Sequence, residues 1–78
     1  MPLPEDSIGY RIRRARMWRG MGQATLARAI GVSPNALSQI EQGRTKAPRS
    51  DIIQAIAREL RVRADFLLCL TEQMEQAA

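Results

Sequence analysis

Apolar residues recur along the chain at helical spacings, in short stretches that glycine, proline and polar residues separate. In the first stretch, Ile8, Ile12 and Ala15 follow one another at i, i+4 and i+7, which places them on one face of a helix. Ser7 stands directly before this stripe, where a hydroxyl side chain commonly caps a helix N-terminus. The pattern predicts a first helix that begins after Ser7 and ends before Gly20.

Two shorter helices are predicted next, with a tight connection between them. Residues 23–30 carry apolar side chains on one face, and Gly31 is a typical C-terminal stop. Ser33 then combines an N-cap with Pro34 at the first helical position, where no backbone donor is lost. The third helix is therefore predicted from about Pro34 to Gln42.

A fourth helix is predicted from about Ser50 and a fifth from about Ala64, so the fold class is all-α with five helices. The fifth carries the run Phe66–Leu70, whose side chains point in several directions at 100° per residue. Not all of these side chains can pack into the core of one chain, and we expect a second copy of the chain to cover the others. The expected dimer surface consists of Phe66, Leu67 and Leu70. Burial of this helix end within the monomer is the alternative.

Composition narrows the class of protein. A chain of 78 residues is one small domain, and 45% hydrophobic residues indicate a globular one. A single cysteine and no histidine leave no internal disulfide and no ordinary zinc site, so we expect neither metal nor cofactor. No glycine-rich phosphate loop and no facing carboxylate pair are recognisable, so we expect no enzyme and no small-molecule ligand. No stretch is long enough to span a membrane, and we expect a cytoplasmic protein.

Charge is divided unevenly along the chain. Between Ile8 and Arg49 there are nine basic residues and one acidic residue, whereas the remainder has three basic and seven acidic residues. A basic field on one portion of a protein is typical of a partner that is a polyanion. A solvated basic face without a partner is the alternative.

The third predicted helix separates polar from apolar side chains. Its apolar arc faces inward and its uncharged polar arc faces outward, and amides and hydroxyls of that kind bind base edges in the major groove of DNA. An ordinary polar surface of a helix is the alternative. The candidate base-reading residues are Asn35, Ser38, Gln39 and Gln42, and the opposite arc is Ala36, Leu37 and Ile40.

Candidate phosphate-binding residues flank this helix. Gln23 combines an amide side chain with a helix N-terminus, which suits a phosphate oxygen. The loop after the third helix supplies the rest, and its cations are placed to hold the DNA backbone without reading sequence. These loop residues are Arg44, Thr45, Lys46 and Arg49.

The chain resembles the Cro/CI-type helix-turn-helix family, also called the xenobiotic-response-element family, which includes the lambdoid phage repressors. The resemblance rests on IGYRIRRAR, GQATLARAIGVSPNALSQIEQGRTKAPR and LRVRADFLL. It implies a compact five-helix, lambda-repressor-like DNA-binding domain over residues 8–70, in which helices 2 and 3 form the helix-turn-helix. Residues 1–7 are then a flexible N-terminal arm, and residues 71–78 are a polar tail. The resemblance also implies a structural ion pair between Arg16 and Glu41.

Four positions depart from the family pattern. Pro34 heads the recognition helix where a polar residue often stands, which reduces a base contact there to a van der Waals contact. Gly22 replaces the usual serine or threonine cap of the second helix. Arg61 and Arg63 replace a glycine and a serine, which removes an easy left-handed stop and an N-cap oxygen, and Asp65 is placed to compensate through the helix dipole.

The function that the residues and the resemblance together predict is sequence-specific binding to double-stranded DNA by a transcriptional regulator. We expect a homodimeric repressor that places two recognition helices about 34 Å apart on a near-palindromic operator. A protein-interaction adaptor with the same fold is the alternative outside this class, and an antitoxin or a restriction-modification controller is the alternative within it.

Overall fold

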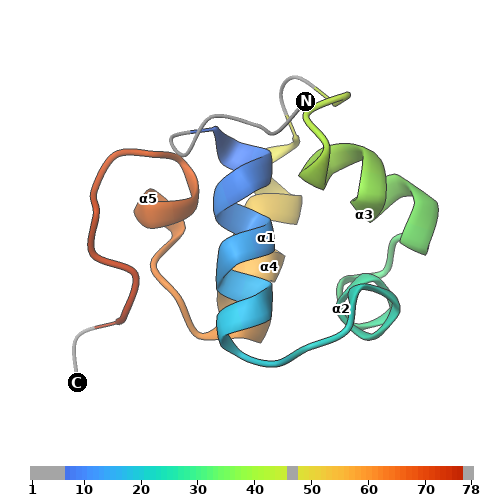
Figure 1. The fold of residues 1–78 in the computed structure, drawn as a ribbon, viewed down its shortest axis with the longest axis horizontal. Coiled ribbons are helices and arrows are strands. Elements are labelled where there is room, and N and C mark those ends of the chain that lie inside the picture. The colour runs from blue at the N-terminus through green and yellow to red at the C-terminus, as the bar shows by residue number, and fades with distance from the viewer. Residues whose placement is uncertain (1–6, 46–47, 77–78) are drawn as a thin grey trace.

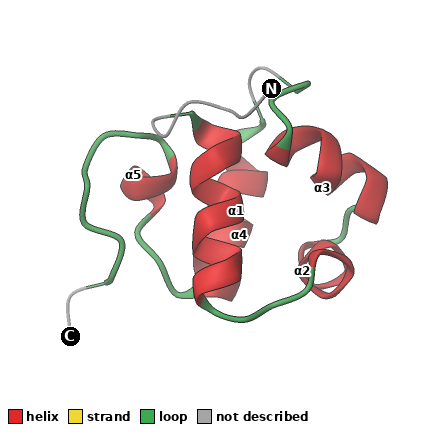
Figure 2. Ribbon diagram, viewed as in Figure 1, coloured by secondary structure: helices red, strands yellow, loops and turns green. Residues whose placement is uncertain are grey.

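The computed structural model describes residues 7–45 and 48–76, which form five helices and no β-strand. Figures 1 and 2 show α1 in front of α4 at the centre, α2 and α3 on one side, and α5 with the C-terminal segment on the other. None of the described helices is long and apolar enough to cross a membrane. The all-α, five-helix class predicted from the sequence is confirmed. The helices are α1 (Ile8–Trp18), α2 (Gln23–Ile30), α3 (Pro34–Glu41), α4 (Ser50–Leu60) and α5 (Ala64–Leu67).

Local chemistry sets the ends of the first three helices. The Ser7 hydroxyl accepts a hydrogen bond from the Tyr10 amide at 3.2 Å, and the Ser33 hydroxyl accepts one from the Ala36 amide at 3.0 Å. Each bond satisfies a backbone donor that the first turn of a helix leaves without a partner. At its other end α2 stops at Gly31, which adopts a left-handed conformation with φ +79°. The predicted bounds of α2 are therefore correct, and α3 ends one residue before the predicted Gln42.

The core lies where α1, α2, α3 and α4 meet, and α5 closes one end of it. It is built from aliphatic side chains and one phenylalanine, because the chain has a single residue of each aromatic type. Burial of this apolar surface is the main favourable contribution to folding. The buried hydrophobic residues are Ile12, Ala15, Leu26, Ala27, Leu37, Ile40, Ile53, Ile56, Ala57, Leu60, Val62, Phe66 and Leu67.

The prediction for the last helix requires a correction. Phe66 and Leu67 are fully buried within the monomer, so they do not form a dimer surface. The physical reason is that α5 is only one turn long, and the chain leaves the helix at Leu68 and takes a left-handed conformation at Cys69, with φ +64°. A single turn directs both side chains inward, and the remaining leucines are turned outward. Leu68 is 41% exposed and Leu70 is 74% exposed.

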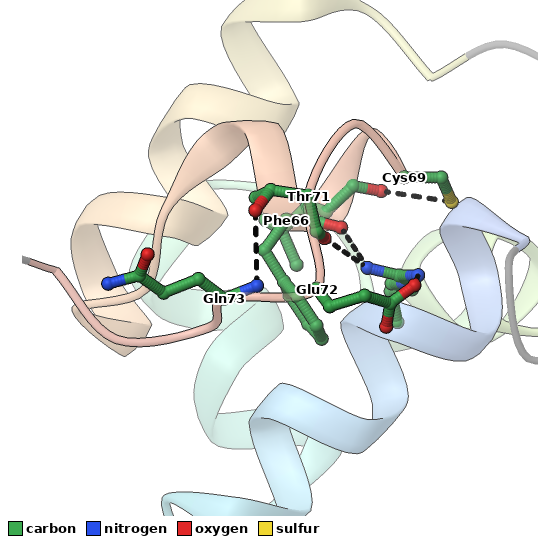
Figure 3. Close-up of polar contacts among 7 residues, drawn as sticks. Phe66, Cys69, Thr71, Glu72 and Gln73 are labelled. Carbon is green, nitrogen blue, oxygen red and sulfur yellow. Dashed lines mark hydrogen bonds and ion pairs between the residues drawn. The ribbon is translucent and has the colours of Figure 1, made fainter.

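Arg11 joins α1 to the C-terminal segment, although it is charged and only 3% exposed. Its Nη1 donates to the carbonyl oxygens of Phe66 at 3.2 Å and of Thr71 at 2.6 Å, and its Nη2 bonds Glu72 at 3.0 Å. The guanidinium also lies 4.6 Å from the centroid of the Phe66 ring. Figure 3 shows Phe66, Thr71 and Glu72 gathered at this point. Residues 71–76 consequently lie against the helices, and Val62 forms an isolated antiparallel bridge with Glu75.

The turn between α4 and α5 forms although Arg61 stands where a glycine was expected. Arg61 adopts the left-handed conformation itself, with φ 56° and ψ 46°. The guanidinium of Arg19 donates to the carbonyl oxygens of Leu60 at 2.6 Å and of Arg61 at 2.9 Å. These bonds satisfy carbonyl groups at the end of α4 that have no partner within the helix.

Asp65 acts mainly through an ion pair with Arg63, whose Nη2 lies 2.7 Å from its Oδ2. The hydrogen bond from this guanidinium lowers the pKa of the Asp65 carboxyl below its usual value. The same hydrogen bond raises the pKa of Arg63. The pair bridges the N-cap position of α5, where the family has a serine, to its first turn.

Candidate nucleic-acid interface

The outer face of α3 carries the four predicted base-reading residues. Asn35, Gln39 and Gln42 are exposed and Ser38 is half-buried. The Gln42 amide donates to the Ser38 hydroxyl at 2.8 Å, so these two side chains already bind each other. Asn35 and Gln39 have no side-chain hydrogen bond to any described residue, which leaves the donors and acceptors of both amides open to an external partner. Among the four candidates, Asn35 and Gln39 are therefore the two whose amides are best placed to contact an external partner.

The inner face of α3 fixes the helix to the domain. Leu37 is fully buried and Ile40 is 7% exposed, and both belong to the core. Side chains packed in a core hold their rotamers and resist displacement. The polar arc is consequently presented by a helix whose position the core determines.

A buried ion pair holds the C-terminal end of α3. Arg16 and Glu41 are joined by two hydrogen bonds, Nε to Oε2 at 2.8 Å and Nη2 to Oε1 at 3.0 Å, and their side chains are 13% and 4% exposed. Arg16 also donates to the Met21 carbonyl at 3.0 Å, and Gln23 donates to Glu41 at 3.4 Å. One arginine thus connects α1, the turn before α2, and the end of α3. Glu41 faces inward and is not part of the exposed arc.

Gly9 allows α1 and α3 to approach closely, a feature that the sequence analysis missed. A Cβ atom on Gly9 would collide with the carbonyl oxygen of Ile40 and would lie 2.8 Å from that of Glu41. Both are backbone atoms, which cannot move aside as the end of a flexible side chain can. A glycine inside a predicted helix, where alanine is preferred, was the available signal for such an approach.

The described members of the predicted phosphate-binding set lie at the start of α2, after the C-terminal end of α3 and at the N-cap of α4. Gln23 is half-buried at the first position of α2, and its N-cap Gly22 supplies no side-chain bond. The Arg44 amide donates to the Gln39 carbonyl at 2.9 Å, so Arg44 follows the polar arc directly. Arg44 and Thr45 are exposed, whereas Lys46 lies outside the described residues.

Arg49 stands at the N-cap of α4, where its guanidinium pairs with Asp51 at 3.2 Å. Both side chains are more than half exposed, and an exposed pair of this kind contributes little to stability. Arg49 can therefore exchange Asp51 for an external anion at small cost. In the sequence, the basic residues of this loop follow directly after the polar arc of α3.

Comparison with known proteins matches residues 12–67 to the family model described as Helix-turn-helix. Among curated proteins, the chain is 41% identical over 59 residues to the HTH-type transcriptional regulator YazB of Bacillus subtilis, covering 76% of this chain and 84% of YazB. It is 36% identical over 55 residues to the HTH-type transcriptional regulator PrtR of Pseudomonas aeruginosa, covering 70% of this chain. The matched region spans only 22% of the length of PrtR.

Among solved structures, the chain is similar to the P22 c2 repressor protein in complex with a synthetic operator. The TM-score is 0.75 at 34% sequence identity, and the match covers 83% of this chain and 97% of the other.

Proposed function

Because this chain belongs to the helix-turn-helix family, we propose that it binds duplex DNA in a sequence-specific way and regulates transcription, as a homodimeric repressor of a near-palindromic operator. The observation that carries the proposal is the pair of open amides, Asn35 and Gln39, on the outer face of a helix whose inner face belongs to the core. The similar P22 c2 repressor forms a complex with operator DNA, which supports the same role for α3.

In this proposal α3 enters the major groove. An asparagine or glutamine amide pairs bidentately with adenine, and one good pair discriminates against other bases by about 1–3 kcal/mol. Asn35 and Gln39 are open on both amide groups, whereas the Gln42 amide and the Ser38 hydroxyl already share one hydrogen bond. Pro34 has no backbone donor and acts as the N-terminal brace of the helix.

Phosphate contacts position this helix without reading sequence. Gln23 has one amide proton directed to Glu41 and a second that remains for a phosphate oxygen at the start of α2. The exposed loop cations neutralise the backbone on the other side, which makes the affinity dependent on salt. The residues assigned to this role are Gln23, Arg44, Thr45, Lys46 and Arg49.

Dimerisation uses the leucines that α5 leaves outside the core. Leu70 is 74% exposed and Leu68 is 41% exposed, and a two-fold contact between two copies removes both from water. Such a dimer presents two α3 helices to successive major grooves about 34 Å apart. Repression follows when the bound dimer blocks access of RNA polymerase to the same DNA.

The test begins with selection of bound sequences from a random duplex pool, followed by affinity measurements on the selected site and on random duplex. Gln39→Ala is expected to weaken the selected site by about 1–3 kcal/mol, or roughly 5- to 150-fold, and random duplex far less. Gln54→Ala is the matched control, because Gln54 is an exposed glutamine on α4. Failure to enrich any site, or equal losses on both duplexes for Gln39→Ala, contradicts the base-reading role.

The oligomeric state is tested separately by sedimentation at micromolar concentration. We expect a dimer that Leu70→Ser dissociates. A wild-type chain that stays monomeric under these conditions, alone and on the selected site, contradicts the dimer.

A further inference from the structure

A second surface of interest lies between the C-terminal turn of α1 and the C-terminal segment. An open hollow of about 670 Å³ is lined there by Arg14, Met17, Trp18, Gln73, Met74 and Glu75. Met17 is 60% exposed and Trp18 is 47% exposed, which is unusual for side chains of this size. The Arg19 guanidinium lies over the Trp18 ring, and both side chains still keep about half of their surface or more in contact with solvent.

The apolar floor of the hollow is held in place before any partner arrives. The Trp18 ring lies 4.4 Å from the guanidinium carbon of Arg19, and Arg19 is itself fixed by the carbonyl oxygens of Leu60 and Arg61. The Met74 backbone is anchored on the other side, because its carbonyl accepts a hydrogen bond from the Arg63 amide at 2.9 Å, and its side chain packs against the core. Tryptophan, methionine and arginine are enriched at protein interfaces, and fixed side chains lose little entropy on binding.

The hollow is separate from the face of α3. Gly9 and Arg16 contact the end of α3 from one face of α1. Arg14, Met17 and Trp18, which line the hollow, lie about 80–180° around the helix from that face. Figure 1 shows the C-terminal end of α1 and the end of the C-terminal segment at the same side of the molecule, remote from the loop that follows α3. A partner in the hollow therefore leaves the proposed DNA-binding face open.

Charge around the hollow selects the kind of partner. The exposed side of α1 carries Arg13 and Arg14, Arg19 lies beside Trp18, and α1 contains no acidic residue. Glu75, in the opposite wall, is the one acid among the described residues that line the hollow, and Glu72 nearby is already paired with Arg11. A second copy of the chain is disfavoured as the partner, because it would bring two arginine-rich α1 faces together. A nucleic acid is disfavoured because it would leave the apolar side chains of Met17 and Trp18 uncovered.

We propose that this hollow docks an acidic segment of another protein, whose large apolar side chains cover Met17 and Trp18 while its carboxylates face Arg13 and Arg14. Binding at this surface does not depend on the reading of bases by α3. The chain thereby connects a protein partner to the DNA that its opposite face holds.

The test uses the full chain and two synthetic amphipathic peptides of about 18 residues, long enough to fold as helices on binding. Both carry the same leucine stripe, and the polar face is glutamate in one peptide and lysine in the other. Trp18 is the single tryptophan of the chain, so its emission reports binding directly. We expect a saturable blue shift with the glutamate peptide and none with the lysine peptide. Equal binding of both peptides, or of neither, overturns the proposal.

Variants locate the binding site by the anisotropy of a labelled peptide. Trp18→Ala is expected to weaken binding by about tenfold or more, as truncation of a tryptophan anchor commonly does. Arg14→Glu is expected to reverse the preference toward the lysine peptide. Arg58→Glu is the matched control, because Arg58 is an exposed arginine on α4 that lies outside the hollow, and it should leave binding unchanged. Circular dichroism verifies that each variant folds.

Two further measurements separate this proposal from the proposed function. Saturating duplex DNA should leave the glutamate peptide bound, and displacement of the peptide would place it on the DNA-binding face and contradict the proposal. Self-association that Trp18→Ala abolishes, together with no peptide binding, would assign the hollow to a second copy. If the wild-type chain proves not to bind DNA, the proposed function fails, but the same peptide binding is still expected.

Discussion

The buried pair between Arg16 and Glu41 offers the sharpest test of how α3 is held. Glu41→Gln keeps the shape of the side chain and removes its charge, so the Arg16 guanidinium stays buried with only the Met21 carbonyl and a neutral amide as partners. Breaking a buried ion pair from one side costs about 3–5 kcal/mol. The Arg16 side chain is 13% exposed and keeps one carbonyl, so we expect the lower end, about 3 kcal/mol.

That loss is large for a chain of 78 residues. At roughly 0.05–0.15 kcal/mol per residue, the free energy of unfolding is about 4–12 kcal/mol. A loss of 1 kcal/mol lowers the melting temperature of a domain of this size by about 4–8 °C, so Glu41→Gln should lower it by about 12–24 °C. Urea unfolding followed by circular dichroism at neutral pH measures the free energy, and a thermal scan measures the midpoint.

Two controls identify the cause. The double variant Arg16→Met with Glu41→Leu removes both charges, and we expect it to recover to within about 1 kcal/mol of the wild type. Asp51→Asn makes the same carboxylate-to-amide change in the exposed pair with Arg49, and we expect it to cost less than about 1 kcal/mol. The reasoning is refuted if Glu41→Gln costs as little as Asp51→Asn, or if the double variant is less stable than Glu41→Gln.

Three other substitutions test single features of the fold. Gly9→Ala should cost about 1–3 kcal/mol and weaken specific DNA binding, because its Cβ collides with backbone carbonyls of α3. A Cβ on Gly22 meets the Thr25 hydroxyl at 3.7 Å, an ordinary contact, so Gly22→Ala should cost less than about 1 kcal/mol in the same urea titration. Arg61→Gly should stabilise the domain by about 0.5–1 kcal/mol in urea unfolding, since glycine adopts the left-handed conformation without strain. The pKa of Asp65 is lower in the folded chain than in the unfolded chain, so its contribution is present above the unfolded pKa and is lost as pH falls through the folded one. Melting temperatures between pH 6 and 2 should therefore fall less steeply for Asp65→Asn, and an unchanged slope would show that the Arg63 contact does not favour the folded state.

The sequence predicted the parts of the fold that depend on neighbouring residues. Ser7 and Ser33 cap the helices that follow them, and Gly31 ends α2, because a cap or a stop acts within one turn of the chain. The alternation of apolar and polar positions in α3 placed Gln39 outside and Leu37 inside for the same reason. Both the helix bounds and the exposed arc depend on interactions between residues that are only a few positions apart in the sequence.

Contacts between distant residues decided the rest. Leu67 became core and Leu70 stayed outside because α5 ends after one turn, a choice made by packing against α1 and α4. Arg11 appeared in the sequence as one more cation of a basic stretch, yet its partners lie 55 to 61 residues further along the chain. No local sequence pattern predicts these partners, since an arginine side chain can equally well face solvent or bind a cluster of carbonyl groups.

The sequence by itself therefore determined which segments are helices and which face of α3 is polar. Only the tertiary structure decided which apolar and basic residues remain available to partners. Trp18, at the edge of the α1 stripe, stays 47% exposed beside the C-terminal segment, and Arg19, which reaches across to the end of α4, lies over its ring. The physical reason is range: helix formation depends on bonds within one or two turns, whereas exposure depends on what the rest of the chain packs against.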